Sequence, residues 1–385
     1  MSGQNATAIE PAERLARLRL ARSENVGPIT YRQLMGHCGD AVTALEALPG
    51  LARRGGRRRP IKLCGADRAA TELDLLETLG GRLLTLDEPD YPPALAAIED
   101  APPVLSVLGD PALPSRRAIA IVGARNASAN GRRFAKRLAA DLGRAGLVVT
   151  SGLARGIDTA AHEGSLDSGS VAVLAGGPDV VYPRENAALY QGLRERGAVV
   201  SEMPAGLVPQ ARHFPRRNRL ISGLSLGVLV VEAAPRSGSL ITARLALEQG
   251  REVFAVPGSP LDPRARGCNH LIRQGAVLTE SAEDVLEVLE GFLAERRIRP
   301  EPPPGAAPEA PEGGPESAPD AASEARVIVK QLLGPSPVLL DEVARQAQLS
   351  AAMVNRVLLE LELAGRVVRH PGNRVSLSMD GDDTG

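Results

Sequence analysis

The chain has 385 residues, enough for two or three domains, and its 43% hydrophobic and 24% charged residues indicate a globular rather than a disordered protein. Aromatic residues make up only 2%, and the three cysteines are widely separated, which excludes a multi-aromatic base-stacking sheet, a disulfide framework and a zinc-cysteine site. The 45 basic and 46 acidic residues give a net charge of −1, a total that by itself argues against a polyanionic partner.

Residues 1–79 are expected to form a helical domain. Two short Gly/Pro turns, Val26-Gly27-Pro28 and Leu48-Pro49-Gly50-Leu51, separate apolar helical stretches, as in tandem helix-hairpin-helix or SAM-like units. Such turns can present backbone N–H groups to phosphate, but they are also common structural joints, so we expect an accessory role. The N-terminus lacks the apolar core of a signal peptide, and no run of 18 apolar residues occurs, so we expect a cytoplasmic protein without membrane contact.

Residues 80–300 are expected to form a Rossmann-like α/β domain. Short, continuously apolar segments alternate with helical stretches, which indicates a doubly wound, mostly parallel sheet covered on both faces. In such sheets, ligands bind at the carboxyl ends of the strands. The expected strands are AIAIVG, LVVTSG, VAVLAGG, AVVSEMP, LGVLVVEA, EVFAVPG and AVLTES.

Three of the loops that follow these strands combine glycine with arginine or a hydroxyl at a helix start. Gly123 and Arg125 precede a helix expected near residue 128, residues 151–156 read Ser-Gly-Leu-Ala-Arg-Gly, and residues 236–239 read Arg-Ser-Gly-Ser. Glycine allows a tight turn, the helix start offers N–H groups, and arginine adds a cation. Together the loops predict a site for a polyanion.

A fourth segment, residues 213–225, is rich in arginine. Its arginines are expected to neutralise phosphates, while Asn218 reads a base edge or holds a loop. Phe214 either stacks on a base or anchors the next helix in the core, and the sequence leaves both interpretations open.

Enzyme chemistry is the competing hypothesis. Asp158 and His162 lie four residues apart, but Asp158 is better explained as a helix cap, and the motifs of metal-dependent, serine and P-loop enzymes are missing. The second glycine of the dinucleotide fingerprint is replaced by Arg125. The alternative that remains is a Rossmann-type nucleoside monophosphate hydrolase of the lysine-decarboxylase-like group, although its P-G-G-x-G-T-x-x-E motif is only echoed at residues 236–239. A purely structural scaffold that binds no DNA is a third hypothesis.

Residues 301–323 hold seven prolines among Ala, Gly and acidic residues, which predicts an extended linker. Residues 324–379 then predict helices over 324–333, 341–347 and 350–364, and a hairpin around Pro371-Gly372-Asn373, which together form a winged helix. Its third helix sets Arg356 against Glu360 and Glu362, a charge pattern that favours protein docking over duplex reading.

The charge is unevenly distributed along the chain. Residues 116–273 carry 22 basic and 12 acidic side chains, whereas residues 274–324 carry 3 and 12. Near-neutrality is therefore a cancellation, and the basic excess falls on the segment with the arginine loops.

The motifs over residues 80–290, in their order along the chain, resemble the DNA-processing protein A (DprA/Smf) family. They are V-G-A-R (122–125), S-G-L-A-R-G-I-D-x-x-A-H (151–162), G-G-x-D-x-x-Y-P-x-E-N (176–186), S-E-x-P-x-G (201–206), F-P-R-R-N-R-L-I-S-G-L-S (214–225), E-A-x-x-R-S-G-S-L-I-T-A (232–243), V-P-G-S (256–259) and G-x-N-x-L-I-R-x-G-A (267–276).

The resemblance implies a cytoplasmic bacterial protein that is not an enzyme. It implies single-stranded DNA binding, a homodimer formed through the Rossmann domain, and loading of RecA recombinase onto incoming DNA during natural transformation. It also implies that Arg125 grips phosphate and that Phe214 to Arg219 form a basic loop. Ala124 departs from the family, where many members carry a hydroxyl residue.

We therefore expect a DNA site without metal, cofactor or catalytic residue. Its expected members are Gly123, Arg125, Ser151, Gly152, Arg155, Gly156, Phe214, Arg216, Arg217, Asn218, Arg219, Arg236, Ser237, Gly238 and Ser239.

Overall fold

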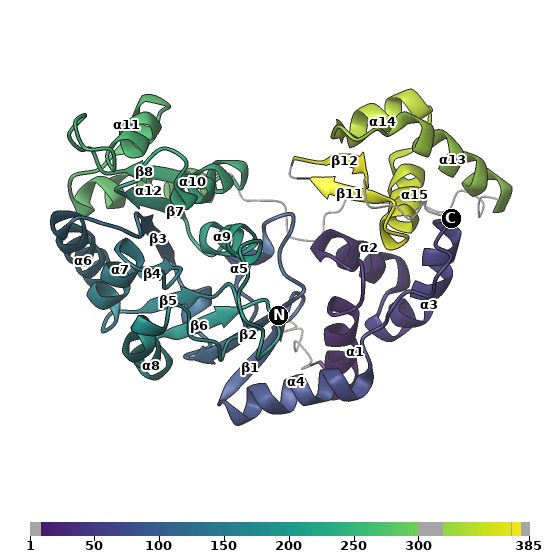
Figure 1. The fold of residues 1–385 in the computed structure, drawn as a ribbon, viewed down its shortest axis with the longest axis horizontal. Helices are drawn as coiled ribbons and strands as arrows, with labels where there is room; N and C mark the ends of the chain where they lie inside the picture. Colours follow the sequence, from purple (N-terminus) through teal and green to yellow (C-terminus); the bar gives the residue numbers. More distant parts are fainter. Residues whose placement is uncertain (1–8, 299–318, 371, 379–385) are drawn as a thin grey trace. The chain divides into compact units, whose positions relative to one another are not determined.

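The computed structural model describes residues 9–298, 319–370 and 372–378, which form two compact units. The first, here called the sheet unit, contains residues 70–298. The second, here called the terminal unit, combines residues 9–69 with the described residues after 318. The helix over Ala66–Thr78 (α4) crosses the division between the units. Figure 1 shows the ribbon with its elements labelled.

The sheet unit is built on a mixed sheet with the strand order β1-β2-β6-β5-β4-β3-β7-β8-β9 in the described residues. The seven neighbouring strands β6-β5-β4-β3-β7-β8-β9 all pair in parallel, which confirms the predicted doubly wound fold. Strands β1 and β2 add an antiparallel edge that the sequence did not predict. The strands span Gly81–Thr85 (β1), Val104–Gly109 (β2), Ala118–Gly123 (β3), Val148–Ser151 (β4), Ser170–Val173 (β5), Ala198–Ser201 (β6), Gly227–Val231 (β7), Glu252–Ala255 (β8) and Val277–Leu278 (β9).

Helices cover both faces of this sheet because its strands are apolar on both sides. Along β3, Ile119 and Ile121 pack with helices α6 (Ala129–Arg144), α7 (Ile157–Ser165) and α12 (Ala282–Ile298). Ala120 and Val122 face the opposite core, with α9 (His213–Gly223) and α10 (Gly238–Glu248). Each buried Ile or Val side chain contributes about 1.5–3 kcal/mol to stability.

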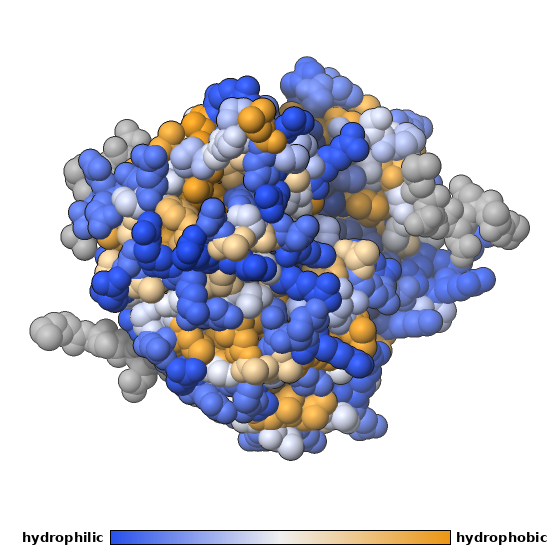
Figure 2. All heavy atoms as spheres, turned by 60° about the vertical axis from the view of Figure 1, so that its left-hand side comes forward, coloured by the Kyte–Doolittle hydropathy of each residue, from blue (hydrophilic) through white to orange (hydrophobic). Residues whose placement is uncertain are grey.

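The sheet unit also contains helices α5 (Pro93–Ala96), α8 (Ala187–Arg196) and α11 (Arg266–Arg273). The face that Figure 2 brings forward, from the α6–α8 side of Figure 1, is mostly hydrophilic with small hydrophobic patches. In the described part of the chain, no helix combines the length and the apolar character needed to cross a membrane.

The strand order reverses between β3 and β7. Strands β3 to β6 follow one another in one direction, whereas β7 to β9 continue on the other side of β3. The crevice outside the carboxyl ends of β3 and β7 is thus the topological switch point, where open α/β sheets bind ligands.

The basic segment that begins at His213 is a helix and not the loop that the family resemblance implied for residues 214–219. Leu220, Ile221 and Leu224 are buried at helical spacing against the sheet, which fixes the segment as α9. Pro215 falls in the first turn of α9, where a missing N–H costs no helical hydrogen bond.

In the terminal unit, helices α1 (Pro11–Ala21), α2 (Pro28–Cys38) and α3 (Ala41–Arg54) pack around a common core. Gly27 precedes α2, where a turn was predicted. The second predicted turn, at residues 48–51, is wrong because these residues lie inside α3. Leu48 and Leu51 are buried on the core side of α3, and their burial holds the helix through Pro49.

The predicted winged helix is confirmed. It comprises α13 (Pro319–Leu332), α14 (Leu340–Ala347) and α15 (Ala351–Leu363), with strands β10 (Val338–Leu339), β11 (Val367–His370) and β12 (Arg374–Leu377) in one sheet. Helix α13 begins inside the predicted linker of residues 301–323, and residues 301–318 lie outside the described residues.

Candidate nucleic-acid interface

Close packing at the carboxyl end of β3 determines where Arg125 lies. A Cβ atom on Gly123 would lie 1.9 Å from the carbonyl oxygen of Val231, so only glycine fits between β3 and β7. Gly156 has a φ of +79°, and a Cβ atom there would lie 2.3 Å from the carbonyl oxygen of Ala124. Both glycines allow the turn after β3 to pack closely against its neighbours. The Arg125 side chain, at the tip of this turn, is exposed.

The aromatic rings of Phe214 and Tyr182 lie next to Arg125. The Arg125 guanidinium carbon is 5.2 Å from the centroid of the Phe214 ring, which is within cation–π distance. The Tyr182 ring centroid is 5.6 Å from that of Phe214, at an interplanar angle of 55°. Phe214 is half-buried, while Tyr182 is 50% exposed. We call Arg125, Tyr182 and Phe214 the Phe214 cluster.

Tyr182 was not among the expected site residues. It does belong to the G-G-x-D-x-x-Y-P motif of residues 176–183. The presence of one of the chain's four tyrosines in this polar motif was the signal that could have identified Tyr182 as a site residue. The contact of Tyr182 with Phe214 depends on how the loop after β5 packs against α9, and this packing cannot be inferred from the sequence. Arg212, exposed immediately before α9, was also missed because the expected arginine cluster was counted from residue 216.

The arginines of α9 divide by helical position. Arg216 is exposed, whereas Arg217 and Arg219 are only 5% and 6% exposed. Arg219 pairs with the buried carboxylate of Glu202 and donates to the carbonyl oxygen of Asp100 at 2.6 Å. Its guanidinium therefore fastens α9 to the end of β6 and to the segment before β2.

Arg217 has a similar structural position. It donates hydrogen bonds to the carbonyl oxygens of Gly152, at 2.6 Å, and Val173. A Cβ atom on Gly152 would lie 2.4 Å from this guanidinium, so glycine is needed for the contact. Burial lowers the pKa of Arg217 to about 10, opposed by the nearby carboxylate of Asp158. Arg217 remains a cation at neutral pH. Its guanidinium carbon lies 6.0 Å from the centroid of the Phe214 ring, so it contacts this ring from the buried side.

The loop after β4 uses its amides internally. The backbone N–H groups of Gly152 and Ala154 both donate to the Asp158 carboxylate, at 3.2 Å each. Burial raises the pKa of Asp158, although Arg217 and the two amides act in the opposite direction. The Ser151 hydroxyl donates to the carbonyl oxygen of Ile121, and Arg155 pairs with Glu185 on the surface. This loop was expected to offer its amides to phosphate, and in this structure the amides of Gly152 and Ala154 already have an acceptor.

The start of α6 is capped by an acidic side chain. Glu232, which follows β7 with a φ of +54°, accepts hydrogen bonds from the Ser128 amide, at 2.8 Å, and from the Ser128 hydroxyl. The Ser128 hydroxyl in turn accepts from the amide of Gly131. A carboxylate therefore occupies the positive end of this helix.

The loop before α10 remains open to solvent. Ser237 caps the helix by accepting from the amide of Ser239, and the two hydroxyls lie 2.8 Å apart. Arg236 and Gly238 are exposed, and in the described part of the chain the Arg236 guanidinium has no ion pair. Asn218 donates to the Gly238 carbonyl oxygen at 3.3 Å, which ties α9 to this loop.

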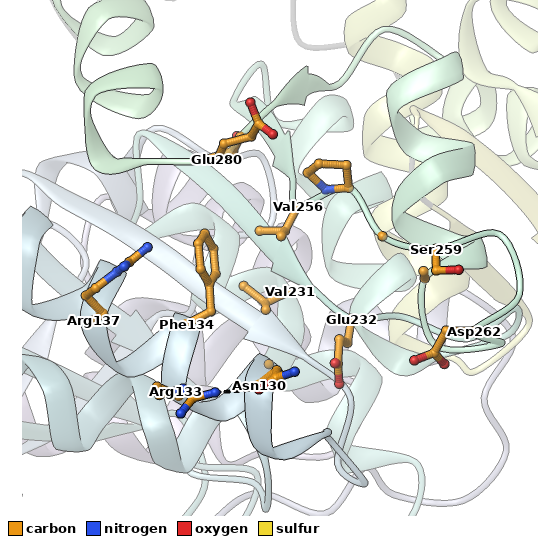
Figure 3. A pocket seen from close by; sticks show the side chains of 15 residues that line it. Asn130, Arg133, Phe134, Arg137, Val231, Glu232, Val256, Ser259, Asp262 and Glu280 are labelled. Atoms are coloured by element: carbon orange, nitrogen blue, oxygen red, sulfur yellow. Dashed lines mark hydrogen bonds between the residues drawn. The ribbon is translucent and has the colours of Figure 1, made fainter.

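A cavity of about 610 Å³ lies on the other side of Glu232, at the ends of β7 and β8 (Figure 3). Phe134, Val231 and Val256 form its apolar part, with arginines of α6 on one side and the carboxylates of Glu232 and Asp262 on the other. The Arg137 guanidinium carbon lies 5.5 Å from the Phe134 ring centroid. The cavity has mixed charge and is separate from the Phe214 cluster. Among the described residues, no group of three His, Cys, Asp or Glu side chains could hold a metal ion.

Comparisons with known proteins place these features in one family. Residues 82–290 match the family model described as DNA recombination-mediator protein A, residues 11–74 match the DprA-like N-terminal HHH domain, and residues 300–373 match the DprA winged helix domain. The chain is 43% identical to Protein Smf of Escherichia coli, covering 78% of this chain and 79% of that protein. It is 47% identical to the DNA processing protein DprA of Bacillus subtilis, covering 54% and 72%.

A solved structure gives the same relationship. The X-ray structure of DNA processing protein A from Streptococcus pneumoniae superimposes with a TM-score of 0.62 at 34% sequence identity. The match covers 73% of this chain and 98% of the Streptococcus pneumoniae chain.

Proposed function

Because the chain belongs to the DNA recombination-mediator protein A family, we propose that it binds single-stranded DNA across the carboxyl ends of β3 and β7. The observation that carries this proposal is the Phe214 cluster, in which two accessible aromatic rings lie beside the exposed guanidinium of Arg125. Unpaired bases stack on aromatic rings, whereas bases within a duplex are already stacked on one another. The cluster therefore fits a single strand better than a duplex.

The exposed arginines are the proposed phosphate contacts. Arg125, Arg216 and Arg236 are exposed in the turn after β3, the first turn of α9 and the loop after β7, and Arg212 lies one helical turn before Arg216. Arg217, Asn218 and Arg219 are buried, and we propose that they position α9 and the loops that meet it. The expected glycines and serines shape these loops by close packing and capping.

The hydrolase alternative has less support. A nucleoside monophosphate hydrolase needs a carboxylate available to water or substrate. Asp158 accepts two backbone amides, Glu232 accepts two hydrogen bonds from Ser128, and Glu202 pairs with Arg219. These three carboxylates at the carboxyl ends of the strands are therefore engaged in holding loops and α9.

A salt series tests the proposed interface. The affinity of the full chain for a single-stranded oligonucleotide and for its duplex is measured by fluorescence anisotropy at several salt concentrations. The double variant Arg125→Gln/Arg216→Gln removes two phosphate contacts and should make the slope of log affinity against log salt shallower by about 1.4. The matched control is Arg144→Gln/Arg244→Gln, which removes two exposed arginines that already pair with carboxylates on α6 and α10. Parental affinity in the Arg125/Arg216 variant, or equal binding of duplex and single strand, would contradict the proposal.

We further propose that the protein acts in the cytoplasm as a homodimer that loads RecA recombinase onto single-stranded DNA during natural transformation. The support for dimerisation is the sheet edge: β9 is an edge strand, and Leu278 on it is 47% exposed. Leu278→Glu should convert the dimer to a monomer in sedimentation experiments. RecA loading is tested by RecA filament formation on DNA precoated with a single-strand binding protein, and transformation by the yield of transformants in a deletion strain.

A further inference from the structure

The terminal unit carries a dense arginine segment that the DNA-site prediction did not use. Five of the seven residues in 53–59 are arginine, and the other two are Gly55 and Gly56. We call this segment, at the end of α3, the arginine loop.

The backbone of the arginine loop is fixed by a Schellman motif. The Gly56 amide donates to the Arg53 carbonyl oxygen at 3.0 Å, and the Arg57 amide donates to that of Ala52 at 3.1 Å. Gly56 has a φ of +92°, as this helix ending requires. The chain beyond the loop is also held, because Lys62 and Glu24 exchange hydrogen bonds at 3.0 Å. The backbone of the arginine loop is therefore held in one conformation by hydrogen bonds at both of its ends.

Two of the five arginines are used to hold the loop. Arg54 pairs with Glu360 of α15 at 2.8 Å, and Arg57 pairs with Glu24 at 2.9 Å. Arg57 also donates to the Arg59 carbonyl oxygen. The remaining three, Arg53, Arg58 and Arg59, are exposed. Within the described residues, neither Arg58 nor Arg59 has a side-chain partner, and Arg53 donates only to a carbonyl oxygen of its own helix.

The winged helix supports this loop from behind. A Cβ atom on Gly55 would lie 1.9 Å from the Glu360 carbonyl oxygen, so α15 touches the loop directly. Glu360 is 1% exposed, and Arg326 of α13 pairs with it at 2.6 Å, opposite Arg54. The charge behind the loop is thus already neutralised, and the three exposed arginines keep their positive charge toward solvent.

The same packing restricts how α15 could approach duplex DNA. A helix-turn-helix domain reads DNA by laying its second helix in the major groove, and α15 follows α14 in that position. Leu359 and Leu363 of α15 are buried in the core of α1–α3, and the Leu363 carbonyl oxygen accepts from the Asn25 side chain at 3.1 Å. The C-terminal half of α15 is therefore covered by the N-terminal helices, whereas Ala352 and Arg356 in its N-terminal half are exposed.

We propose that the arginine loop, through Arg53, Arg58 and Arg59, is a second contact for the phosphate backbone of the bound DNA strand, with α15 as its support. Guanidinium groups bind phosphate oxygens bidentately, and three of them on one rigid loop match a polyanion better than a single phosphate. The inference rests on the proposed function, because it takes the strand held by the Phe214 cluster as the ligand.

The test compares a short and a long single strand on the full chain. The short oligonucleotide has about 8 nucleotides, within the span of one single-strand binding domain, and the long one is several times longer. The variant is Arg53→Gln/Arg58→Gln/Arg59→Gln. The control, Arg68→Gln/Lys330→Gln/Arg374→Gln, removes three exposed cations elsewhere on the terminal unit.

The expected result is specific for the long strand. The loop variant should lose about tenfold in affinity for it, with a salt slope shallower by about 2, and should bind the short strand like the parent. Parental affinity for the long strand, or an equal loss in the control, would overturn the second contact and leave the core site intact. Failure of the parent to bind either strand would instead refute the proposed function, and the second contact with it.

Discussion

The guanidinium of Arg125 and the ring of Phe214 are brought together from opposite faces of the sheet unit, one from the turn after β3 and one from the first turn of α9. A cation and an aromatic ring 5.2 Å apart, both accessible, form a surface on which a base can stack while its phosphate is neutralised.

Phe214→Leu should weaken single-strand binding by about 1–3 kcal/mol, because a branched aliphatic side chain fills the half-buried position but offers no stacking face. The loss should be similar for different base sequences, since every base has a π-face. Fluorescence anisotropy with homopolymeric oligonucleotides measures it. Phe134→Leu is the control, because that ring lines the separate cavity beside Arg137. Equal affinities of the Phe214 variant and the parent would remove Phe214 from the interface.

Arg219→Ala should destabilise the sheet unit by about 3–5 kcal/mol, because it leaves the buried Glu202 carboxylate without its main partner. Arg216→Ala, on the exposed side of the same helix, should leave stability nearly unchanged and weaken DNA binding. Hydrogen exchange of α9 under urea gives the stability of this unit separately, since a chain of two units does not unfold as one. Similar stabilities for the two variants would contradict the division of α9 into a buried and an exposed side.

The sequence predicted the central strands because continuous Val, Ile and Ala runs are typical of buried parallel strands. It did not predict β1 and β2, which pair antiparallel with each other, and β2 also pairs antiparallel with β6, which is distant in the sequence. The family resemblance implied a basic loop over residues 214–219, and this was wrong because the segment is part of α9. The helical spacing of Leu220, Ile221 and Leu224 was the available signal for α9.

The sequence could predict which loops form the candidate site, but not which arginines and backbone amides in these loops are available to a ligand. The glycine turns and arginines were visible, and they do gather at one sheet edge. Which arginines are exposed depends on partners far along the chain, such as Glu202 and Asp100 for Arg219. Which amides are free depends on whether a carboxylate already accepts them, as Asp158 does after β4.

Glu232→Ala should destabilise α6 by about 1–3 kcal/mol, because the Ser128 amide and hydroxyl lose their acceptor and the helix loses a negative charge at its start. Glu232→Gln removes the charge and one of the two acceptor oxygens but keeps the other, so its cost should be smaller than that of the alanine variant. Hydrogen exchange of the first turns of α6 measures both. An unchanged α6 in the alanine variant would show that the cap contributes little.

His162 should make the sheet unit less stable as the pH falls below neutrality. Its ring is completely buried on α7, with Nδ1 2.8 Å from the Ser170 hydroxyl, and burial lowers its pKa from 6.5 to about 3, with Arg217 acting in the same direction. The unfolded chain takes up a proton near pH 6.5 whereas the folded chain does not. The stabilisation is therefore complete above pH 6.5 and is lost progressively toward pH 3.

The contribution of His162 is isolated with His162→Gln, which cannot take up that proton. Between pH 6 and pH 4, the parent should lose up to about 1.4 kcal/mol per pH unit more than the variant, since one proton separates the two states. Other groups titrate in both proteins and cancel in the difference. Hydrogen exchange of α7 and β5 across a urea series at each pH supplies the free energies. Parallel pH profiles would show that His162 is already protonated, or accessible to protons, in the folded protein.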